Sequence, residues 1–350
     1  MILNFCTCEH KSIGKLFTLE HCQTNLRYNW HICSIFFAVV KLVLKNRKLY
    51  NAFSLGKKER TIYQLYYISL LQLVISCFAV ANVTDEELIK LSVELGKIDD
   101  SFAKLSGVTL NLQRRYSQDS TSSLGQLFGE VPADVKLRPS VAAFVELFEH
   151  FIPETGKEEI ISKRKSKTID NFIVAVVESS VMKMFMQFLR SKNISEASSE
   201  NEFKKYLQTI WFQLYPRKNH VLDSCAFEHT FLGEIYKKKV MGMHNWIRMA
   251  YLQETEKAQY NGYYSLIADK YLSISFTWNK ATKHKSGFLL RTSPEYEMAL
   301  YTMCYIFRNE QDCFVKFRSC TGNIFTYSLQ RRNKSYLSTA YFVPDSDCKN

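Results

Sequence analysis

The chain has 350 residues, of which 46% are apolar and only six are prolines, so it is long and apolar enough to fold around a substantial core and is not a disordered protein. Its formal net charge is +12, but residues 1–81 hold +7 of it and residues 82–350 only +5. The overall charge is therefore weak evidence for nucleic-acid binding, and local clusters of residues must carry that argument.

An internal stretch near the start of the chain has the three parts of a secretory signal peptide. A basic segment, GKKER, is followed by an apolar run at 66–80 and then by an Ala-Val-Ala cleavage site. Because such signals begin at an N-terminus, we expect residues 1–65 to be an extension that the mature protein lacks and residues 66–81 to be the signal peptide core and cleavage site. A secreted protein would then begin near Asn82. The alternative is a membrane protein held by an uncleaved signal anchor.

The next part of the chain, residues 82–216, has the pattern of a series of helices. Thr84 followed by Glu87 predicts a capping box at the start of the first helix. The mixed-charge stretch 157–167 is interpreted as a solvated connection between helices. Apolar residues at helical spacing predict three more helices, at 138–151, 169–190 and 202–216.

From residue 217 onward the apolar pattern shifts toward the period of two that is typical of strands. Residues 272–278 alternate between large apolar and small hydroxyl side chains, which predicts a half-buried strand. Ser293, followed by proline and glutamate, predicts the start of a short helix between strands. The other strands are expected at 288–291, 301–307, 313–319, 323–329 and 335–343. The fold class is therefore α+β, with a helical part at 82–216 and a largely antiparallel β-rich part at 217–346.

The cysteines and asparagines give further clues to the compartment. No pair of cysteines has the CxxC spacing of a zinc ribbon or a redox motif. If the later part is secreted, a short excursion of the chain would allow Cys304 and Cys313 to form a disulfide. Three acceptor sequons for N-glycosylation begin at Asn82, Asn193 and Asn333, and they agree with secretion.

The later part also holds candidates for metal-free cleavage of RNA by its own 2′-hydroxyl group. That reaction needs a base for the 2′-OH proton, an acid for the departing 5′-oxygen and a cation for the phosphorane. Histidine suits both proton transfers and lysine suits the cation. His229, His244 and Lys283 are the candidates. Glu228 precedes the first histidine, and Gly242 gives the backbone conformational freedom just before the second.

Five segments of the later part occur in a characteristic order and spacing. They are FEHTFLGE (227–234), GMHNWIRMAYLQE (242–254), FTWNKATK (276–283), TSPEYEMALYTMCY (292–305) and SYLSTAY (335–341). Together they resemble the EndoU/XendoU family of endoribonucleases. The resemblance extends over residues 82–344, and nothing before residue 82 takes part in it.

This resemblance implies an EndoU-type fold and an enzyme that cuts single-stranded RNA at uridylates, leaving 2′,3′-cyclic phosphate ends. His229 and His244 match the two catalytic histidines of the family, and Lys283 matches its catalytic lysine. We therefore expect a monomeric protein that acts on single-stranded, uridine-containing RNA and does not bind DNA. The alternative is a catalytically weakened RNA-binding protein or a membrane-anchored relative.

The resemblance also implies supporting residues around these three. Glu228 and Glu234 match acids that the family needs for activity. Thr339 and Tyr341 match a pair that lines the site, where a hydroxyl group can help to select uracil and an aromatic ring can stack on a base. Ser293 belongs to the SPE element and is expected to contact substrate. Because family members often depend on manganese or calcium, the two acids either hold a divalent cation or support proton transfer.

Overall fold

The structure is a computed structural model, and it describes residues 83–118, 124–217, 220–331, 334–346 and 348. The expected N-terminal extension and signal peptide lie outside the described residues, as do the sequons at Asn82 and Asn333. Asn193, the remaining sequon asparagine, is exposed just after a helix.

The helices of the first half begin at polar capping residues. Thr84 and Glu87 form the predicted capping box, in which the Glu87 N–H donates to Thr84 Oγ1 at 3.3 Å. Ser179 and Ser199 cap later helices in the same way, each accepting a backbone N–H three residues on. The helices are α3 (Asp85–Ser106), α4 (Ala133–Lys136), α5 (Pro139–Glu146), α6 (Lys163–Val177), α7 (Ser180–Ser191) and α8 (Glu200–Phe212), with the short turns η2 (Leu147–Glu149) and η3 (Ser195–Ala197).

Two predictions for this half were wrong. The single helix expected at 169–190 is divided into α6 and α7, which meet at 77°, because Ser179 caps a new helix there. The stretch 157–167, expected to be solvated, contains the first turn of α6 and the buried Lys165. Lys165 is only 2% exposed because its ammonium group pairs with Glu159 and lies 3.7 Å from the centroid of a phenylalanine ring.

No single helix within the described residues is long and apolar enough to cross a membrane. The bent pair α6 and α7 passes that test of length and composition only when its two members are taken together.

The strands form two sheets, and every strand follows the helices of the first half. The five-stranded sheet has the order β1-β2-β5-β4-β3, in which β2 and β5 are parallel and the other neighbours are antiparallel. The second sheet, β6-β7-β8, is antiparallel throughout. The strands are β1 (Glu234–Tyr236), β2 (Lys239–Met241), β3 (Ala258–Ile267), β4 (Tyr271–Trp278), β5 (Ala281–Leu289), β6 (Phe314–Phe317), β7 (Cys320–Arg331) and β8 (Lys334–Pro344). The α+β fold class is confirmed.

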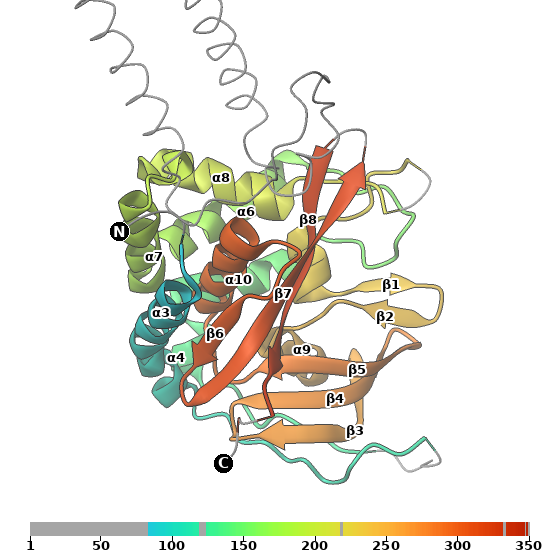
Figure 1. Ribbon diagram of the computed structural model, residues 1–350. Coiled ribbons are helices and arrows are strands. Elements are labelled where there is room, and N and C mark those ends of the chain that lie inside the picture. The colour runs from blue at the N-terminus through green and yellow to red at the C-terminus, as the bar shows by residue number, and fades with distance from the viewer. Residues whose placement is uncertain (1–82, 119–123, 218–219, 332–333, 347, 349–350) are drawn as a thin grey trace, which may run out of the picture. The chain divides into compact units, whose positions relative to one another are not determined.

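The strand predicted at 301–307 was wrong, because these residues belong to the long helix α10 (Pro294–Arg308). Ser293 caps this helix as predicted, with its side chain accepting the N–H of Tyr296 at 3.2 Å. The helix contacts α3, α5, α6, α7, β7 and β8, and lies at the centre of the described fold (Figure 1). Because α10 is buried on all sides, it shows no amphipathic period by which the sequence could reveal it. A second helix, α9 (Trp246–Glu254), was not predicted at all.

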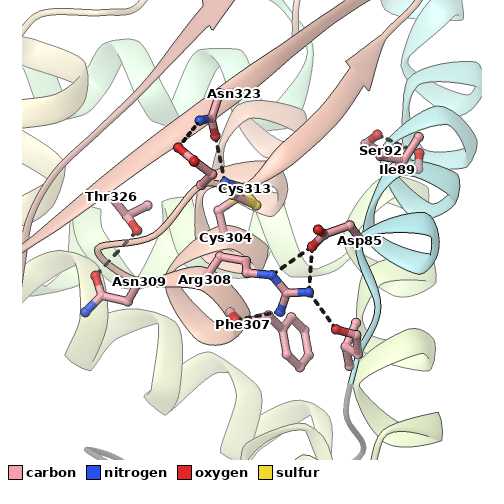
Figure 2. Close-up of a disulfide and its surroundings, with 12 residues drawn as sticks. Asp85, Ile89, Ser92, Cys304, Phe307, Arg308, Asn309, Cys313, Asn323 and Thr326 are labelled. Carbon is pink, nitrogen blue, oxygen red and sulfur yellow. Dashed lines mark hydrogen bonds and ion pairs between the residues drawn. A yellow bond between two sulfur atoms is a disulfide. The ribbon is translucent and has the colours of Figure 1, made fainter. Parts of the chain in front are cut away.

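The predicted disulfide between Cys304 and Cys313 is present and joins the last turn of α10 to the start of β6 (Figure 2). The N–H of Cys313 donates to Oδ1 of Asn323 at 2.6 Å, which holds the linked segment against β7. A further disulfide, Cys320–Cys348, ties the C-terminal end of the described chain to β7 and was not predicted. Both bridges therefore stabilise the β6-β7-β8 sheet.

Candidate active site

His229 lies on η4 (Glu228–Leu232), a single turn of π-helix that leads into β1. Its neighbours in the turn are buried, whereas the His229 side chain is 12% exposed. Phe227 and Phe231 anchor the turn in an aromatic cluster, with their ring centroids 5.3 Å apart. Thr230 joins the turn to β8, because its hydroxyl accepts the N–H of Ala340 at 3.2 Å. The fold thus presents the imidazole of His229 from a rigid support.

The loop that carries His244 is fixed directly to this turn by backbone hydrogen bonds. The N–H of Met243 donates to the carbonyl of His229 at 3.0 Å, and the N–H of His244 donates to that of Thr230 at 2.8 Å. Gly242 makes this approach possible, since it adopts a φ of 62° and an added β-carbon would lie 1.7 Å from the carbonyl oxygen of His229. The main chain therefore sets the separation of the two histidines.

Lys283 comes from a different element, the antiparallel strand β5, where it pairs with Phe276 of β4. Ser275 fixes its backbone, because the serine hydroxyl donates to the carbonyl of Lys283 at 3.1 Å. The side chain is half-buried, and burial lowers the pKa of Lys283 to about 8. The charge of Lys283 in turn lowers the pKa of both His229 and His244, so the three side chains form one electrostatic group.

His229 is held by a carboxylate and a guanidinium group. Its Nδ1 atom lies 2.6 Å from Oε2 of Glu234, and Nε of Arg217 lies 2.8 Å from the same oxygen. Burial and the charge of Arg217 lower the pKa of His229, while Glu234 opposes them. Burial alone would raise the pKa of Glu234, but the interactions with His229 and Arg217 hold it below its usual value. Glu234 is therefore an ionised carboxylate that orients the imidazole.

His244 is oriented by a carbonyl group and an aromatic ring. Its Nδ1 atom lies 3.3 Å from the carbonyl oxygen of Gly287, and its ring stacks on that of Tyr341 with centroids 5.2 Å apart. Burial lowers the pKa of His244 well below its usual value, and the charges of Lys283 and His229 lower it further. With Nδ1–H donated to the carbonyl oxygen, the unprotonated Nε2 is left as a proton acceptor.

Thr339 and Tyr341 lie on β8, separated by the buried Ala340, and both side chains are half-buried. Because alternate residues of a strand point to the same face, the threonine hydroxyl shares the face on which the Tyr341 ring meets His244. Of the two residues predicted to select the base, Tyr341 thus contacts His244, and Thr339 lies on the same face of β8. Ser293 is not in this group: it is fully buried as the cap of α10, and its N–H donates to Asp99 Oδ2 at 3.3 Å.

Glu228 also stands apart from the histidines and the lysine. It is completely buried, and neither of its carboxylate oxygens has a hydrogen-bond partner. Burial raises the pKa of Glu228 well above its usual value, and the charge of Glu234 raises it further. Burial therefore favours the neutral form of Glu228.

The two acids alone do not form a site for a divalent cation. Oε2 of Glu234 is engaged by His229 and Arg217, whereas Oε1 of Glu234 and both oxygens of Glu228 are buried without a hydrogen-bond partner. Across the described part of the chain, no group of three or more His, Cys, Asp or Glu side chains could hold a metal ion.

Arg217 is the functional residue that sequence reasoning missed. Besides Glu234, its guanidinium donates to Ser224 Oγ at 3.0 Å, to the hydroxyl of Tyr215 at 3.1 Å and to the carbonyl of Ser338 at 3.0 Å. Arg217 thereby links Glu234, which orients His229, to the strand that carries Thr339 and Tyr341. The sequence pointed to Arg217 only through its place in the segment LYPRKNHVLDS (214–224), which also takes part in the resemblance to the EndoU/XendoU family.

Comparison with known proteins gives a consistent result. The family model "Endoribonuclease XendoU" matches residues 87–342. The uridylate-specific endoribonuclease of Mus musculus is 35% identical over 279 residues, covering 75% of this chain and 67% of the relative. Uridylate-specific endoribonuclease D of Xenopus laevis is 31% identical over 280 residues, covering 75% of this chain and 90% of the relative.

A solved structure is also similar. The structure of XendoU, described as a splicing-independent snoRNA-processing endoribonuclease, superposes with a TM-score of 0.60 at 28% identity and covers 72% of this chain and 97% of the other. The family match includes the turn, the loop and both strands that form the site. The chain therefore belongs to the XendoU family of endoribonucleases.

Proposed function

We propose that this enzyme cleaves single-stranded RNA on the 3′ side of uridylates, using His229, His244 and Lys283 and no metal ion in the chemical step. The observation that carries the proposal is that three separate elements bring these side chains together: backbone hydrogen bonds join the His229 turn to the His244 loop, and the charge of Lys283 on β5 lowers the pKa of both histidines. The names of the relatives, uridylate-specific and poly(U)-specific endoribonuclease, support the choice of substrate.

The two histidines have different surroundings, and these suggest different roles. His244 has the more strongly lowered pKa and an Nε2 free to accept, so it suits the base that takes the 2′-OH proton. His229 has the Glu234 carboxylate at Nδ1, which stabilises the protonated imidazole, so it suits the acid that protonates the departing 5′-oxygen.

The bonds and protons balance in a single transesterification. The 2′-oxygen forms a bond to phosphorus as its proton passes to His244, and the bond from phosphorus to the 5′-oxygen breaks as His229 gives up a proton. The ammonium group of Lys283 faces the charge that grows on the nonbridging oxygens. The products are a 2′,3′-cyclic phosphate and a free 5′-hydroxyl, and no net proton is consumed.

Selection of uracil is proposed for the pair on β8. The hydroxyl of Thr339 can donate or accept a hydrogen bond at the edge of the base, and Tyr341 offers part of its ring for stacking. Tyr341 already packs on His244, so a base stacked nearby would lie close to the group that removes the 2′-OH proton.

We also propose that the protein is secreted as a monomer, with a membrane-anchored form as the alternative. Two disulfides agree with an oxidising compartment, because such bonds persist mainly outside the cytosol. Finding the protein in membrane pellets after a carbonate wash, and not in the medium, would reject secretion in favour of an anchor.

The test is cleavage of oligouridylate and oligoadenylate by the full chain, with product ends identified by mass spectrometry. We expect 2′,3′-cyclic ends from oligouridylate only, and loss of cleavage in His229→Ala and in His244→Ala. His284→Ala is a matched control, because this neighbouring histidine is exposed. Full activity in either active-site variant would reject the assignment. Tight binding of oligouridylate by the wild-type protein without cleavage would indicate an RNA-binding protein instead.

Parallel reactions with Mn²⁺, with Ca²⁺ and with a chelator test the metal-free chemical step. Cleavage that persists in the chelator supports it, whereas complete dependence on one ion would show that a cation takes part.

A further inference from the structure

A cavity of about 250 Å³ lies against the turn that carries His229. Glu228 of that turn and Gly233, which follows it, line one side, Arg248 of α9 lines another, and Trp278 at the end of β4 contributes an aromatic wall. Its volume is below the roughly 300–1,000 Å³ that is typical of pockets for drug-sized molecules. The cavity is therefore suited to a small ligand.

The guanidinium group of Arg248 is the main charge in this cavity. It is held between two aromatic rings, with Cζ 4.6 Å from the ring centroid of Phe148 and 5.3 Å from that of Trp278. Its Nε–H donates to the carbonyl of Leu232 at 3.4 Å. Arg248 is only 6% exposed, yet no carboxylate of the described residues lies within 4.0 Å of it. The buried positive charge of Arg248 therefore has no direct ion pair, and the charges of Glu149 and Glu228 act on it only from a greater distance.

The second polar group in the cavity is the side chain of Glu228. It is fully buried and both of its oxygens lack partners, which is costly for a polar group in a protein interior. Burial raises the pKa of Glu228 well above its usual value and so favours the neutral acid, which has an O–H to donate. An acceptor oxygen placed in the cavity would satisfy it.

The remaining charges around the cavity cancel one another. Lys257 and Glu149 form an ion pair at 2.9 Å, with side chains that are 44% and 62% exposed. The charge left over in the cavity is the single positive charge of Arg248, which an occupant with one negative charge would neutralise.

From this geometry we propose that the cavity binds a small oxyanion, a carboxylate or a phosphate, between Arg248 and Glu228. The planar guanidinium group offers N–H donors in the arrangement that matches two oxygens of such an anion. The acid of Glu228 donates to an oxygen of the same group. Glu228 begins the turn that carries His229 and Gly233 follows its last residue, so the bound anion would brace the turn on which the catalytic imidazole depends.

The first test measures binding and not catalysis, so it is independent of whether the chain cleaves RNA. Inorganic phosphate and acetate are titrated separately into the full chain, and the shift in thermal unfolding is followed. We expect a saturable rise with at least one of the two anions, and Arg248→Gln should weaken it roughly tenfold or more. The anion that gives the rise identifies whether the site takes a phosphate or a carboxylate.

Lys283→Gln is the matched control, because the catalytic group can also attract anions. The proposal requires the rise to persist in Lys283→Gln. If the rise is lost in Lys283→Gln and kept in Arg248→Gln, the anion binds at the catalytic group and the proposal is wrong. Absence of a saturable rise with either anion would indicate a cavity filled only by water, and would equally overturn it.

A second measurement avoids any variant that fails to fold. Crystals of the wild-type protein are soaked in selenate, whose selenium is located by anomalous scattering. A peak within hydrogen-bonding distance of the Arg248 guanidinium supports the site. A peak only beside His229, His244 and Lys283, or no peak, contradicts it.

Discussion

The imidazole of His229 and the carboxylate of Glu234 form a 2.6 Å contact between Nδ1 and Oε2, and the same oxygen also meets Arg217. The turn that holds the histidine ends at Leu232, and Glu234 is the first residue of β1. A single glycine, Gly233, therefore joins the turn that carries His229 to the strand that begins with the acid orienting it.

Glu234→Gln tests this relationship. The neutral amide can turn either its oxygen or its nitrogen toward His229. The imidazole then has no fixed tautomer, and its protonated form is no longer stabilised by a carboxylate. We expect kcat on oligouridylate to fall by roughly 10²- to 10⁴-fold, as in other oriented histidines that lose a carboxylate. Glu154→Gln is the control, because this acid pairs with Lys157 on the surface. A kcat within twofold of wild type would show that Glu234 has no such role.

Lys283→Gln tests the electrostatic coupling of the three side chains. Below its pKa of about 8 the ammonium group of Lys283 disfavours a protonated His244, so its removal should raise the pKa of His244 toward the usual value. The difference in His244 protonation between the variant and the wild type should appear below pH 8 and vanish above it, where the lysine is neutral. NMR titration of the histidine ring nitrogens measures this.

Lys285→Gln is the control for that titration, since Lys285 is exposed two residues further along β5. An unchanged His244 titration in Lys283→Gln would place the lysine away from the histidines.

Tyr341→Ala tests the ring that stacks on His244. Such aromatic contacts contribute about 0.5–1.5 kcal/mol, so a less well-fixed imidazole should lower kcat by roughly 2- to 12-fold. Tyr341→Phe keeps the ring and should retain nearly all of the activity. Single-turnover kinetics on oligouridylate separate this effect from product release. If Tyr341→Phe is as impaired as Tyr341→Ala, the hydroxyl group matters and not the stacking.

Asp99→Asn tests a buried acid beneath the cap of α10. Burial raises the pKa of Asp99 from its ordinary 3.8 to about 7, and the charge of Glu295 contributes. A raised carboxyl pKa means that the wild-type protein loses stability as pH rises from about 4 through 7. At about 1.4 kcal/mol per unit the loss is at most on the order of 4 kcal/mol.

The asparagine variant has no proton to lose there, so its stability relative to wild type should increase with pH across that range. Urea unfolding measured well below and well above pH 7 follows the difference. Asp100→Asn is the control, because Asp100 is partly exposed and pairs with Arg318 at 3.2 Å. If the free energy of unfolding of Asp99→Asn changes with pH in the same way as that of the wild type, the raised pKa of Asp99 is contradicted.

Features that depend on neighbouring residues could be predicted from the sequence. The capping box of Thr84 and Glu87 and the strand at 272–278 are local patterns, and the structure contains both. The strand is not half-buried as predicted, because Ser273 and Ser275 on its other face are buried as well. The family motifs indicated the fold class, and the structure also brings His244 and Tyr341 into contact.

Features that depend on tertiary contacts could not be predicted. Helix α10 is buried on every side, so part of its sequence resembled a buried strand. Arg217 matters through its contact with Glu234, which lies 17 positions later and is reached only in the folded chain. Cys320 and Cys348 are too far apart in sequence for spacing to suggest their pairing.

The close approach at Gly242 has a consequence for how the enzyme fails on heating. Two backbone hydrogen bonds join the His229 turn to the His244 loop where Gly242 approaches the turn. Loosened packing elsewhere would leave the spacing of the two imidazoles intact until those bonds open. Cleavage activity should therefore disappear in one cooperative step, at the temperature where the whole domain melts.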